Sequence, residues 1–474
     1  MRIAKPAQVA MINGLMRTPR HQLIASMGLG KSGALLMHAG GLEFHLGGWP
    51  GLCIVAPLQV ALAWRREIPL WRPDLRVSLV AGDKKAREQA LHTSADVYLL
   101  TYDNLPWMHE YVGGSWAKFG EVMVCDESTR IKKTRASFQT SSKGKRFLRT
   151  DGGVQTNSLA MHAGDFPFWV NATGTPTPNG LTDLWGQYWY VDGGYRLGNS
   201  YTSFEQRWFR VPNQHSDFAK VEPLPGAAEQ ISALVADVTT VVRVEDYIDV
   251  AKPNVVDRYV ELPEKARRVY REMKARMRAE VEGKQVTALT AAAKTAKLLQ
   301  IASGFAYWRD EDLDPELNQC EELHAVKLDA VESILEETNE PLVVVYYFKA
   351  TLEQMKRRFK GRLRELDAKG QAQDDWNAGK VEILALQYSK GSMGLSLQHG
   401  GRNICLLTPT YKADDYVQVL ERLGPLRQMQ SGYKRAVNVF RILASATVDR
   451  KVFDVVQDKQ DVERAMVELL MGDD

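Results

Sequence analysis

The sequence predicts an α/β fold in which two domains each contain a parallel sheet covered by helices. Short apolar runs rich in β-branched residues alternate with helical patterns, and they do so in two blocks. The runs are GLCIVAP, DVYLLTY, EVMVCDE and FWVNATG in the first block and PLVVVYY, VEILALQ, NICLLTP and AVNVFRI in the second. Such alternation is typical of parallel sheets, because each parallel connection needs a crossover that is usually a helix. A chain of 474 residues, 45% of them hydrophobic, can bury two such cores.

A break in the pattern predicts where the two domains meet. The segment DVAKPN, residues 249–254, places a proline and polar residues between the blocks. We therefore expect one domain over residues 1–250 and a second over residues 251–474.

Composition narrows the classes of protein. The net charge of +3 is too small for a protein that coats polyanions over its whole surface, so any nucleic-acid surface must be local. No apolar stretch is long enough for a membrane span, and the start, MRIAKPAQ, has no signal-peptide core, so we expect a cytoplasmic protein. Scattered cysteines, three of them within apolar runs, indicate buried thiols in a reducing compartment: Cys53, Cys125, Cys320 and Cys405.

The stretch SMGLGKSGALL, Ser26 to Leu36, has the composition of a phosphate-binding loop. It follows the strand candidate HQLIA and precedes the helix candidate SGALLMHA. Gly28 and Gly30 let backbone N–H groups turn inward, Lys31 can meet the terminal phosphates, and Ser32 can bind magnesium. The alternative is an ordinary glycine turn.

A second candidate site lies in EVMVCDESTRIKK, Glu121 to Lys133. An apolar strand delivers two acidic residues to its carboxyl end, where sheets of this class bind their ligands. Asp126 is suited to hold magnesium and Glu127 to polarise the attacking water. A solvated acidic turn is the alternative, and the expected order after a phosphate loop makes it the weaker one.

Further segments, in the same order along the chain, resemble the motifs of superfamily II helicase-type motors. The chain is similar to the Swi/Snf-type DNA translocases among them, especially the compact versions found in bacteriophages. The matching segments are MGLGKS (motif I), IVAPLQVALAWRREI (Ia), LLTYDNL (Ib), DESTRIKK (II), NATGTPTPNGLTDLW (III), KLDAVESILEETNEPLVVVYYF (the opening of the second motor domain with motif IV), YSKGSMGLSLQHGG (V) and QVLERLGPLRQ (VI).

The resemblance implies two tandem RecA-like domains that bind ATP with Mg²⁺ in the cleft between them. It assigns the adenine edge to Gln8, whose alternative role is that of a polar surface residue on an amphipathic helix. It assigns coupling between the nucleotide and the nucleic acid to Thr173 and Thr175, which could instead cap a turn. In motif V it places three residues where the second domain meets nucleotide and backbone phosphate: Ser392, Gly394 and Ser396.

Motif VI departs from the family pattern. Gln418 and Arg422 match, but Pro425 stands where the family has a second arginine, and Arg427 follows two residues later. An arginine that neutralises charge on the transferred phosphate can supply about 10³-fold or more in rate. Either Arg427 takes over, or Arg422 works alone, or hydrolysis is impaired.

Two regions outside the motifs carry predictions of their own. Residues 132–149 have many cations and no acidic residue, so a basic loop with Lys143, Lys145 and Arg146 could contact DNA phosphates or could simply be solvated. The aromatic segment from Leu184 to Arg210 could stack on bases, but such spacing more often forms a helical core. We expect a helical and aromatic insertion at about residues 184–235 and helices at about residues 262–305 that open the second domain.

The resulting prediction is an ATP-dependent DNA translocase. Two alternatives remain: a strand-separating DNA or RNA helicase, and a nucleotide-gated DNA-binding factor with weak ATPase activity. We expect a monomer that acts on duplex or branched DNA, has no membrane partner, and works in the bacterial host cytoplasm if it is encoded by a phage.

Overall fold

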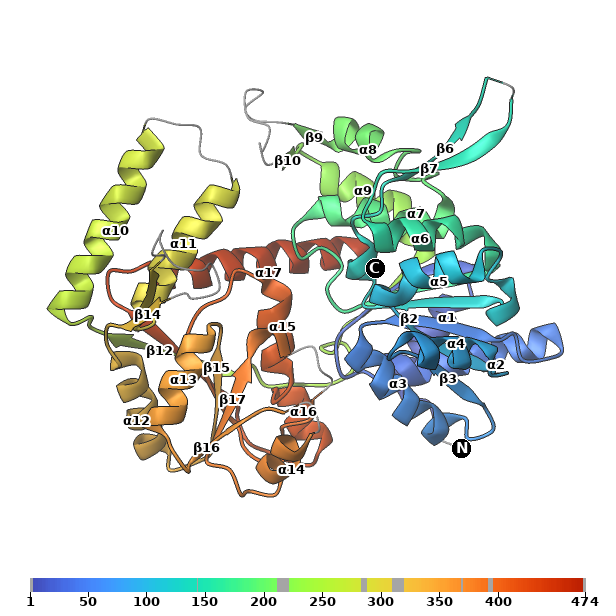
Figure 1. Cartoon of the computed structure of the whole chain (residues 1–474). Helices are drawn as coiled ribbons and strands as arrows, with labels where there is room; N and C mark the ends of the chain where they lie inside the picture. Colours follow the sequence, from blue (N-terminus) through green and yellow to red (C-terminus); the bar gives the residue numbers. More distant parts are fainter. Residues whose placement is uncertain are drawn as a thin grey trace. The chain divides into compact units, whose positions relative to one another are not determined.

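Parallel strands dominate both halves of the chain in the computed structural model (Figure 1). The structure describes residues 3–142, 144–210, 221–282, 288–308, 319–367, 370–390 and 395–471, with only the backbone course at 277–282, 288–294 and 462–471. The chain divides into two units. Among the described residues, the first unit holds 3–210, 221–249 and 459–471, and the second holds 250–458.

The first unit is built on a seven-stranded sheet in the order β11-β1-β8-β5-β2-β4-β3. Every pairing in it is parallel. Its strands are β1 (Arg20–Ala25), β2 (Leu52–Ala56), β3 (Val77–Val80), β4 (Val97–Thr101), β5 (Val122–Asp126), β8 (Phe168–Thr173) and β11 (Thr239–Val242).

Helices cover both faces of this sheet, which explains why its strands are almost continuously apolar. One face packs against α1 (Pro6–Leu15), α2 (Lys31–Leu46) and α3 (Leu58–Trp71). The other packs against α4 (Lys84–His92), α5 (Leu105–Val112), α6 (Val154–Met161), α7 (Leu184–Asp192), α8 (Tyr201–Trp208) and α9 (Ala227–Val235). Two small antiparallel pairs complete the unit: β6 (Ala136–Thr140) with β7 (Arg146–Thr150), and β9 (Phe209–Arg210) with β10 (Glu222–Pro223).

The aromatic segment of this unit forms a core. All residues of α7 from Leu184 to Val191 are buried, as are Phe204 and Trp208 of α8. The prediction of a helical core is therefore confirmed for the aromatic residues of α7 and for Phe204 and Trp208, which are not available for base stacking. Tyr195, between the two helices, is 87% exposed and lies outside this core.

The second unit contains a six-stranded parallel sheet in the order β12-β19-β18-β15-β17-β16. Its strands are β12 (Asn254–Val260), β15 (Leu342–Tyr346), β16 (Leu363–Glu365), β17 (Ile383–Gln387), β18 (Asn403–Leu406) and β19 (Asn438–Ala444). One face packs against α12 (Val326–Thr338) and α13 (Lys349–Arg358), and the other against α14 (Gln371–Asn377), α15 (Ala413–Glu421) and α17 (Asp449–Met471). Also present are α10 (Glu264–Glu282), α11 (Ala288–Ala302), α16 (Pro425–Gln430) and the hairpin β13 (Phe305–Trp308) with β14 (Gln319–Glu322).

The predicted fold class, α/β with parallel sheets and additional helices, is confirmed. Each apolar run named above forms a strand of one of the two large sheets. All four cysteines are free, and three are buried as expected, whereas Cys320 is exposed on β14. Among the described residues, no helix combines the length and apolar character needed to cross a membrane.

One expectation about local structure is wrong. The basic segment after β5 is not a loop but the antiparallel hairpin β6–β7, with Phe138 paired opposite Leu148. Its turn is closed by hydrogen bonds from the Ser141 amide to the Lys145 carbonyl and from the Gly144 amide to the Ser141 carbonyl. Gly144 has φ +76°, which a residue with a side chain rarely adopts. Charge composition alone concealed this turn and the strands beside it.

Candidate functional site

Three adjacent strands of the first unit bring the predicted nucleotide residues to one edge of its sheet. The order β1-β8-β5 places motif III between motifs I and II. Ile24 of β1 is level with Thr173 of β8, and Asp126 of β5 is level with Ala172. Since all three strands are parallel, their carboxyl ends lie side by side, at the edge where sheets of this class bind ligands.

The loop after β1 has the backbone of a phosphate cradle. Gly28 has φ +82° and Gly30 has φ +80°, a region that favours glycine. Gly30 is the N-cap residue of α2 and has no side chain with which to cap the first N–H groups of the helix. Lys31 begins α2 and its Nζ donates to the Ala25 carbonyl at 2.9 Å, so the ammonium group lies across the loop. A glycine turn of this conformation, followed by a helix N-terminus with a cation, fits a polyphosphate.

Gln8 is next to this loop and is not a surface residue. It lies on α1 and is 2% exposed. Its Nε2 donates to the Gly30 carbonyl at 2.9 Å, and its Oε1 accepts from the Lys5 amide at 3.0 Å. The Gln8 amide retains a second N–H and a second acceptor lone pair, so it can keep both hydrogen bonds and still pair with a base. The place of Gln8 suits the predicted role, which stays a prediction.

The two acidic residues of motif II differ sharply in their surroundings. Asp126 ends β5 and is 6% exposed; its Oδ2 accepts from the Trp64 indole N–H at 2.8 Å and its Oδ1 accepts from the Glu127 amide at 3.1 Å. Glu127 has φ +56°, in the left-handed region that costs energy for a residue other than glycine.

The groups next to Asp126 in the core are neutral. Burial raises the pKa of the Tyr102 phenol and of the Cys125 thiol well above their usual values, so both groups stay neutral. The hydroxyl of Ser32 and the carboxylate of Asp126 are oxygen ligands of the kind that Mg²⁺ prefers.

Motif III lies in the loop after β8. Thr173 is fully buried and Thr175 nearly so, and the Thr173 hydroxyl accepts from the Thr175 amide at 3.1 Å. Between them, a Cβ added to Gly174 would come within 3.7 Å of the Lys31 Nζ. Thr173 therefore does form a local turn contact, in a loop that also reaches the phosphate-loop lysine.

Motifs V and VI meet within the second unit. Pro425 is the first residue of α16, so motif VI is split into α15 and α16 with Arg422 at the end of α15. The Arg427 guanidinium donates to the Ser396 hydroxyl of motif V at 3.2 Å, and Arg422 is 8% exposed. Ser392 and Gly394 lie outside the described residues.

Comparisons with known proteins agree with the motif pattern. The model of the SNF2-related domain matches residues 9–150. Protein p41 of Acyrthosiphon pisum secondary endosymbiont phage 1 is 37% identical over 98% of this chain and 97% of its own length. The chain belongs to the SNF2 family. An uncharacterized ATP-dependent helicase of Mycoplasma genitalium is 24% identical over 88% of this chain, which spans 37% of that protein.

Among solved structures, the Sulfolobus solfataricus SWI2/SNF2 ATPase core in complex with dsDNA aligns with 98% of this chain and 93% of its own, at 17% identity and a TM-score of 0.41. As an SNF2 protein, the chain belongs to the helicase-like motors of the ATPase class.

Two residues that support the SNF2 site have no counterpart among the sequence predictions. Trp64 of α3, 1% exposed, orients the Asp126 carboxylate. Gln187 of α7, fully buried, accepts from the Ser128 hydroxyl at 2.9 Å and donates to the Pro176 carbonyl at 2.7 Å, thereby joining motif II to motif III. The sequence places both in apolar or aromatic helices, where a core role explains them equally well.

The predicted basic residues lie apart from this edge of the sheet. Lys145 and Arg146 are exposed on the hairpin β6–β7, and the Arg146 guanidinium lies 4.2 Å from the centre of the Phe138 ring. Lys143 lies outside the described residues.

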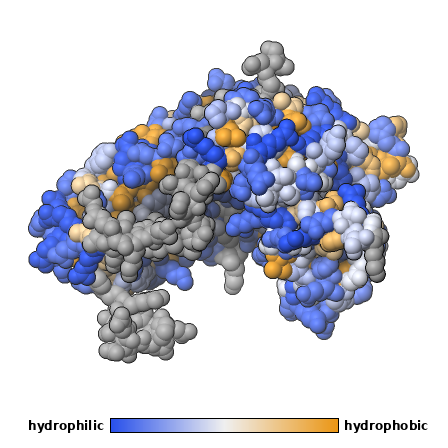
Figure 2. Space-filling model, turned by 90° about the horizontal axis from the view of Figure 1, so that it is seen from above, coloured by the Kyte–Doolittle hydropathy of each residue, from blue (hydrophilic) through white to orange (hydrophobic). Residues whose placement is uncertain are grey.

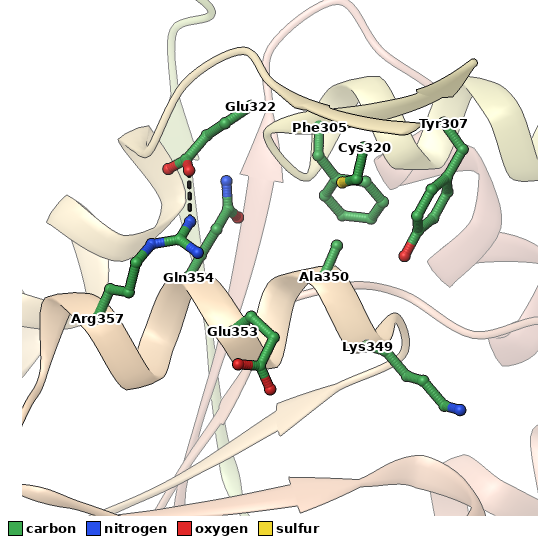
Figure 3. A pocket seen from close by; sticks show the side chains of 9 residues that line it. All are labelled: Phe305, Tyr307, Cys320, Glu322, Lys349, Ala350, Glu353, Gln354 and Arg357. Atoms are coloured by element: carbon green, nitrogen blue, oxygen red, sulfur yellow. Dashed lines mark hydrogen bonds and ion pairs between the residues drawn. The ribbon is translucent and has the colours of Figure 1, made fainter. Parts of the chain in front are cut away.

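A separate pocket of about 390 Å³ opens in the second unit between the hairpin β13–β14 and α13 (Figure 3). Phe305 and Tyr307 line it from the hairpin, and an ion pair between Glu322 and Arg357 closes one side. None of the residues that line it belongs to the predicted site, so this pocket is not the nucleotide candidate.

Proposed function

We propose that this SNF2 protein hydrolyses ATP with Mg²⁺ and uses the energy to move along DNA. The observation that carries the proposal is the adjacency of β1, β8 and β5, which gathers motifs I, III and II at one edge of the sheet. In this proposal Lys31 and the α2 N-terminus hold the phosphates, Ser32 and Asp126 hold the metal ion, and Glu127 polarises water. The bound Mg²⁺ would neutralise charge that develops on the phosphate oxygens.

DNA is the proposed partner for two reasons. SNF2 membership supports a nucleic-acid motor, and the hairpin β6–β7 exposes cations without an acidic residue between positions 132 and 150. Phosphate contacts release counterions, so binding would weaken steeply as salt rises. Threonines of motif III would couple the nucleotide to the DNA, because their loop adjoins the Lys31 ammonium group.

An ATPase assay with and without duplex DNA tests the proposal. We expect turnover that DNA stimulates, abolished by Lys31→Ala with the fold and much of the DNA binding retained, because Lys31 would meet ATP and not DNA. Near-parental turnover of Lys31→Ala would contradict the phosphate-loop assignment.

The second candidate function is a nucleotide-gated DNA-binding factor with weak hydrolysis. It is favoured by one observation: Pro425 begins a new helix at the position of the missing arginine, and Arg427 is engaged by Ser396. A parent chain that binds ATP and DNA but hardly hydrolyses ATP, and that Pro425→Arg activates, would support this candidate over the motor.

A further inference from the structure

The two faces of the hairpin β6–β7 differ in what they contact. In an antiparallel pair, alternate residues point to opposite faces and residues directly opposite each other share one face. Phe138 and Leu148 are such a pair, and they share the inner face. The Phe138 ring stacks on Trp189 of α7 with centroids 6.0 Å apart, and Leu148 packs against the core of the first unit.

The outer face carries an aromatic ring between two cations. Phe147 is paired opposite Gln139, and Arg149 opposite Ser137. The Lys145 carbonyl accepts from the Ser141 amide at 2.9 Å, so the pairing of the two strands extends to Lys145. Because Lys145 is two residues before Phe147, it lies on the same face. Successive residues on one strand face are about 7 Å apart, so the two cations flank the ring on either side.

The Phe147 ring has a face that is open to solvent. The surface seen from above is mostly hydrophilic, with hydrophobic residues in small patches (Figure 2). Phe147 is 44% exposed and Phe138 is 43% exposed. The Phe138 ring stacks on Trp189 and lies under the Arg146 guanidinium, whereas Phe147 stacks on no ring among the described residues. In Figure 1 the hairpin extends away from the body of the first unit, and Lys145, Phe147 and Arg149 on its outer face are exposed.

The charges of the outer face favour an anionic ligand. Lys145 is exposed, and Arg149 pairs with Asp151 at 3.0 Å, with more than half of each side chain exposed. An exposed ion pair of this kind is worth at most about 1 kcal/mol, so a phosphate can replace Asp151. Between the cations, the face offers only Phe147, Gln139 and Ser137, which repel no anion.

We propose that the outer face of this hairpin binds unpaired nucleotides by stacking one base on Phe147 while Lys145 and Arg149 contact the flanking phosphates. Within continuous duplex DNA the faces of each base are covered by its neighbours, so the Phe147 ring cannot stack on a base there. In an unpaired segment, such as a single-stranded tail, a gap or a branch, a base face is free, and stacking on an aromatic side chain stabilises it. The inference rests on the proposed DNA function and narrows its substrate to DNA with an unpaired segment.

The test compares a blunt duplex with the same duplex carrying a single-stranded thymidine tail, by fluorescence anisotropy on the full chain. Phe147→Leu keeps an apolar side chain but removes the ring. We expect the dissociation constant of the tailed duplex to rise about 5-fold or more and that of the blunt duplex to stay unchanged. Phe147→Tyr should bind like the parent. Phe44→Leu, a matched change at an exposed phenylalanine of α2, should leave both affinities unchanged.

A tail that contains 2-aminopurine reports stacking directly. We expect the parent to quench its fluorescence and Phe147→Leu to quench it less. The inference is overturned if Phe147→Leu behaves like Phe44→Leu on the tailed duplex, if it weakens both DNAs equally, or if it changes the oligomeric state, which would make the face a contact between copies. In each of those outcomes DNA binding and DNA-stimulated turnover of the parent still support the proposed function. A parent that binds neither DNA overturns both proposals.

Discussion

The hydrogen bond between Trp64 and Asp126 gives the sharpest prediction for the nucleotide site. Trp64→Phe removes the indole N–H that donates to the Asp126 Oδ2 at 2.8 Å and keeps an aromatic ring in the core. A hydrogen bond to a charged group is worth about 1.5–3 kcal/mol. Because the carboxylate is 6% exposed, water replaces the lost donor poorly. That free energy corresponds to about 10- to 100-fold, the range typical for a group that orients a metal ligand.

The assay is ATP turnover as a function of Mg²⁺ concentration. We expect Trp64→Phe to need about tenfold or more Mg²⁺ for half-maximal turnover, since a carboxylate held by one donor fewer binds the ion less well. Protein melting temperature, followed by circular dichroism, shows whether the variant is folded.

Trp208→Phe is the matched control. Trp208 is 1% exposed on α8, and its Nε1 has no hydrogen-bond partner in the described structure, so the same truncation leaves packing as the only loss. If both variants melt at similar temperatures and require the same Mg²⁺, Trp64 is a packing residue and the argument about Asp126 fails.

Three further predictions follow from the other motifs. Glu127→Gln should bind ATP like the parent but stall hydrolysis, because the amide cannot polarise water; equal loss of binding, measured with a fluorescent ATP analogue, would mean a different role. Arg422→Ala should reduce turnover by orders of magnitude and Arg427→Ala by less, with ATP binding little changed; parental turnover in both would exclude them as the arginines that stabilise the transition state. Lys327→Met should destabilise the second unit by about 3–5 kcal/mol, seen as a lower melting temperature, because the Lys327 Nζ pairs at 2.6 Å with Asp449, whose side chain is fully buried; a melting temperature equal to that of the parent would show that this carboxylate is not left as an unpaired charge.

The pattern of apolar runs along the chain by itself determines much of the fold. Parallel strands buried on both faces are nearly continuous apolar runs, so the strands β2, β4, β5 and β8 could be read directly from composition. The strands β3 and β12 could not be predicted in this way. β3 has only four residues and β12 is partly exposed along its length, so neither forms a clear hydrophobic pattern in the sequence. Glycines at Gly28 and Gly30 could likewise be assigned to a loop, since a positive φ is a local property.

Tertiary structure decided which side chains from distant segments support the site and which surfaces are free. The bond from Trp64 to Asp126 joins residues 62 positions apart, and Gln187 joins motifs II and III from a helix that looks like plain core. A sequence pattern reports the burial of a helix face, but it does not report which polar atom on that face meets another. The hairpin shows the same limit: alternation places Phe138 and Phe147 on opposite faces only once the strands are paired. Only the packing of α7 against one face gives Phe138 a ring to stack on and leaves Phe147 without one among the described residues. Local sequence determines backbone preference, whereas side-chain partners depend on how chain segments far apart in sequence are brought together.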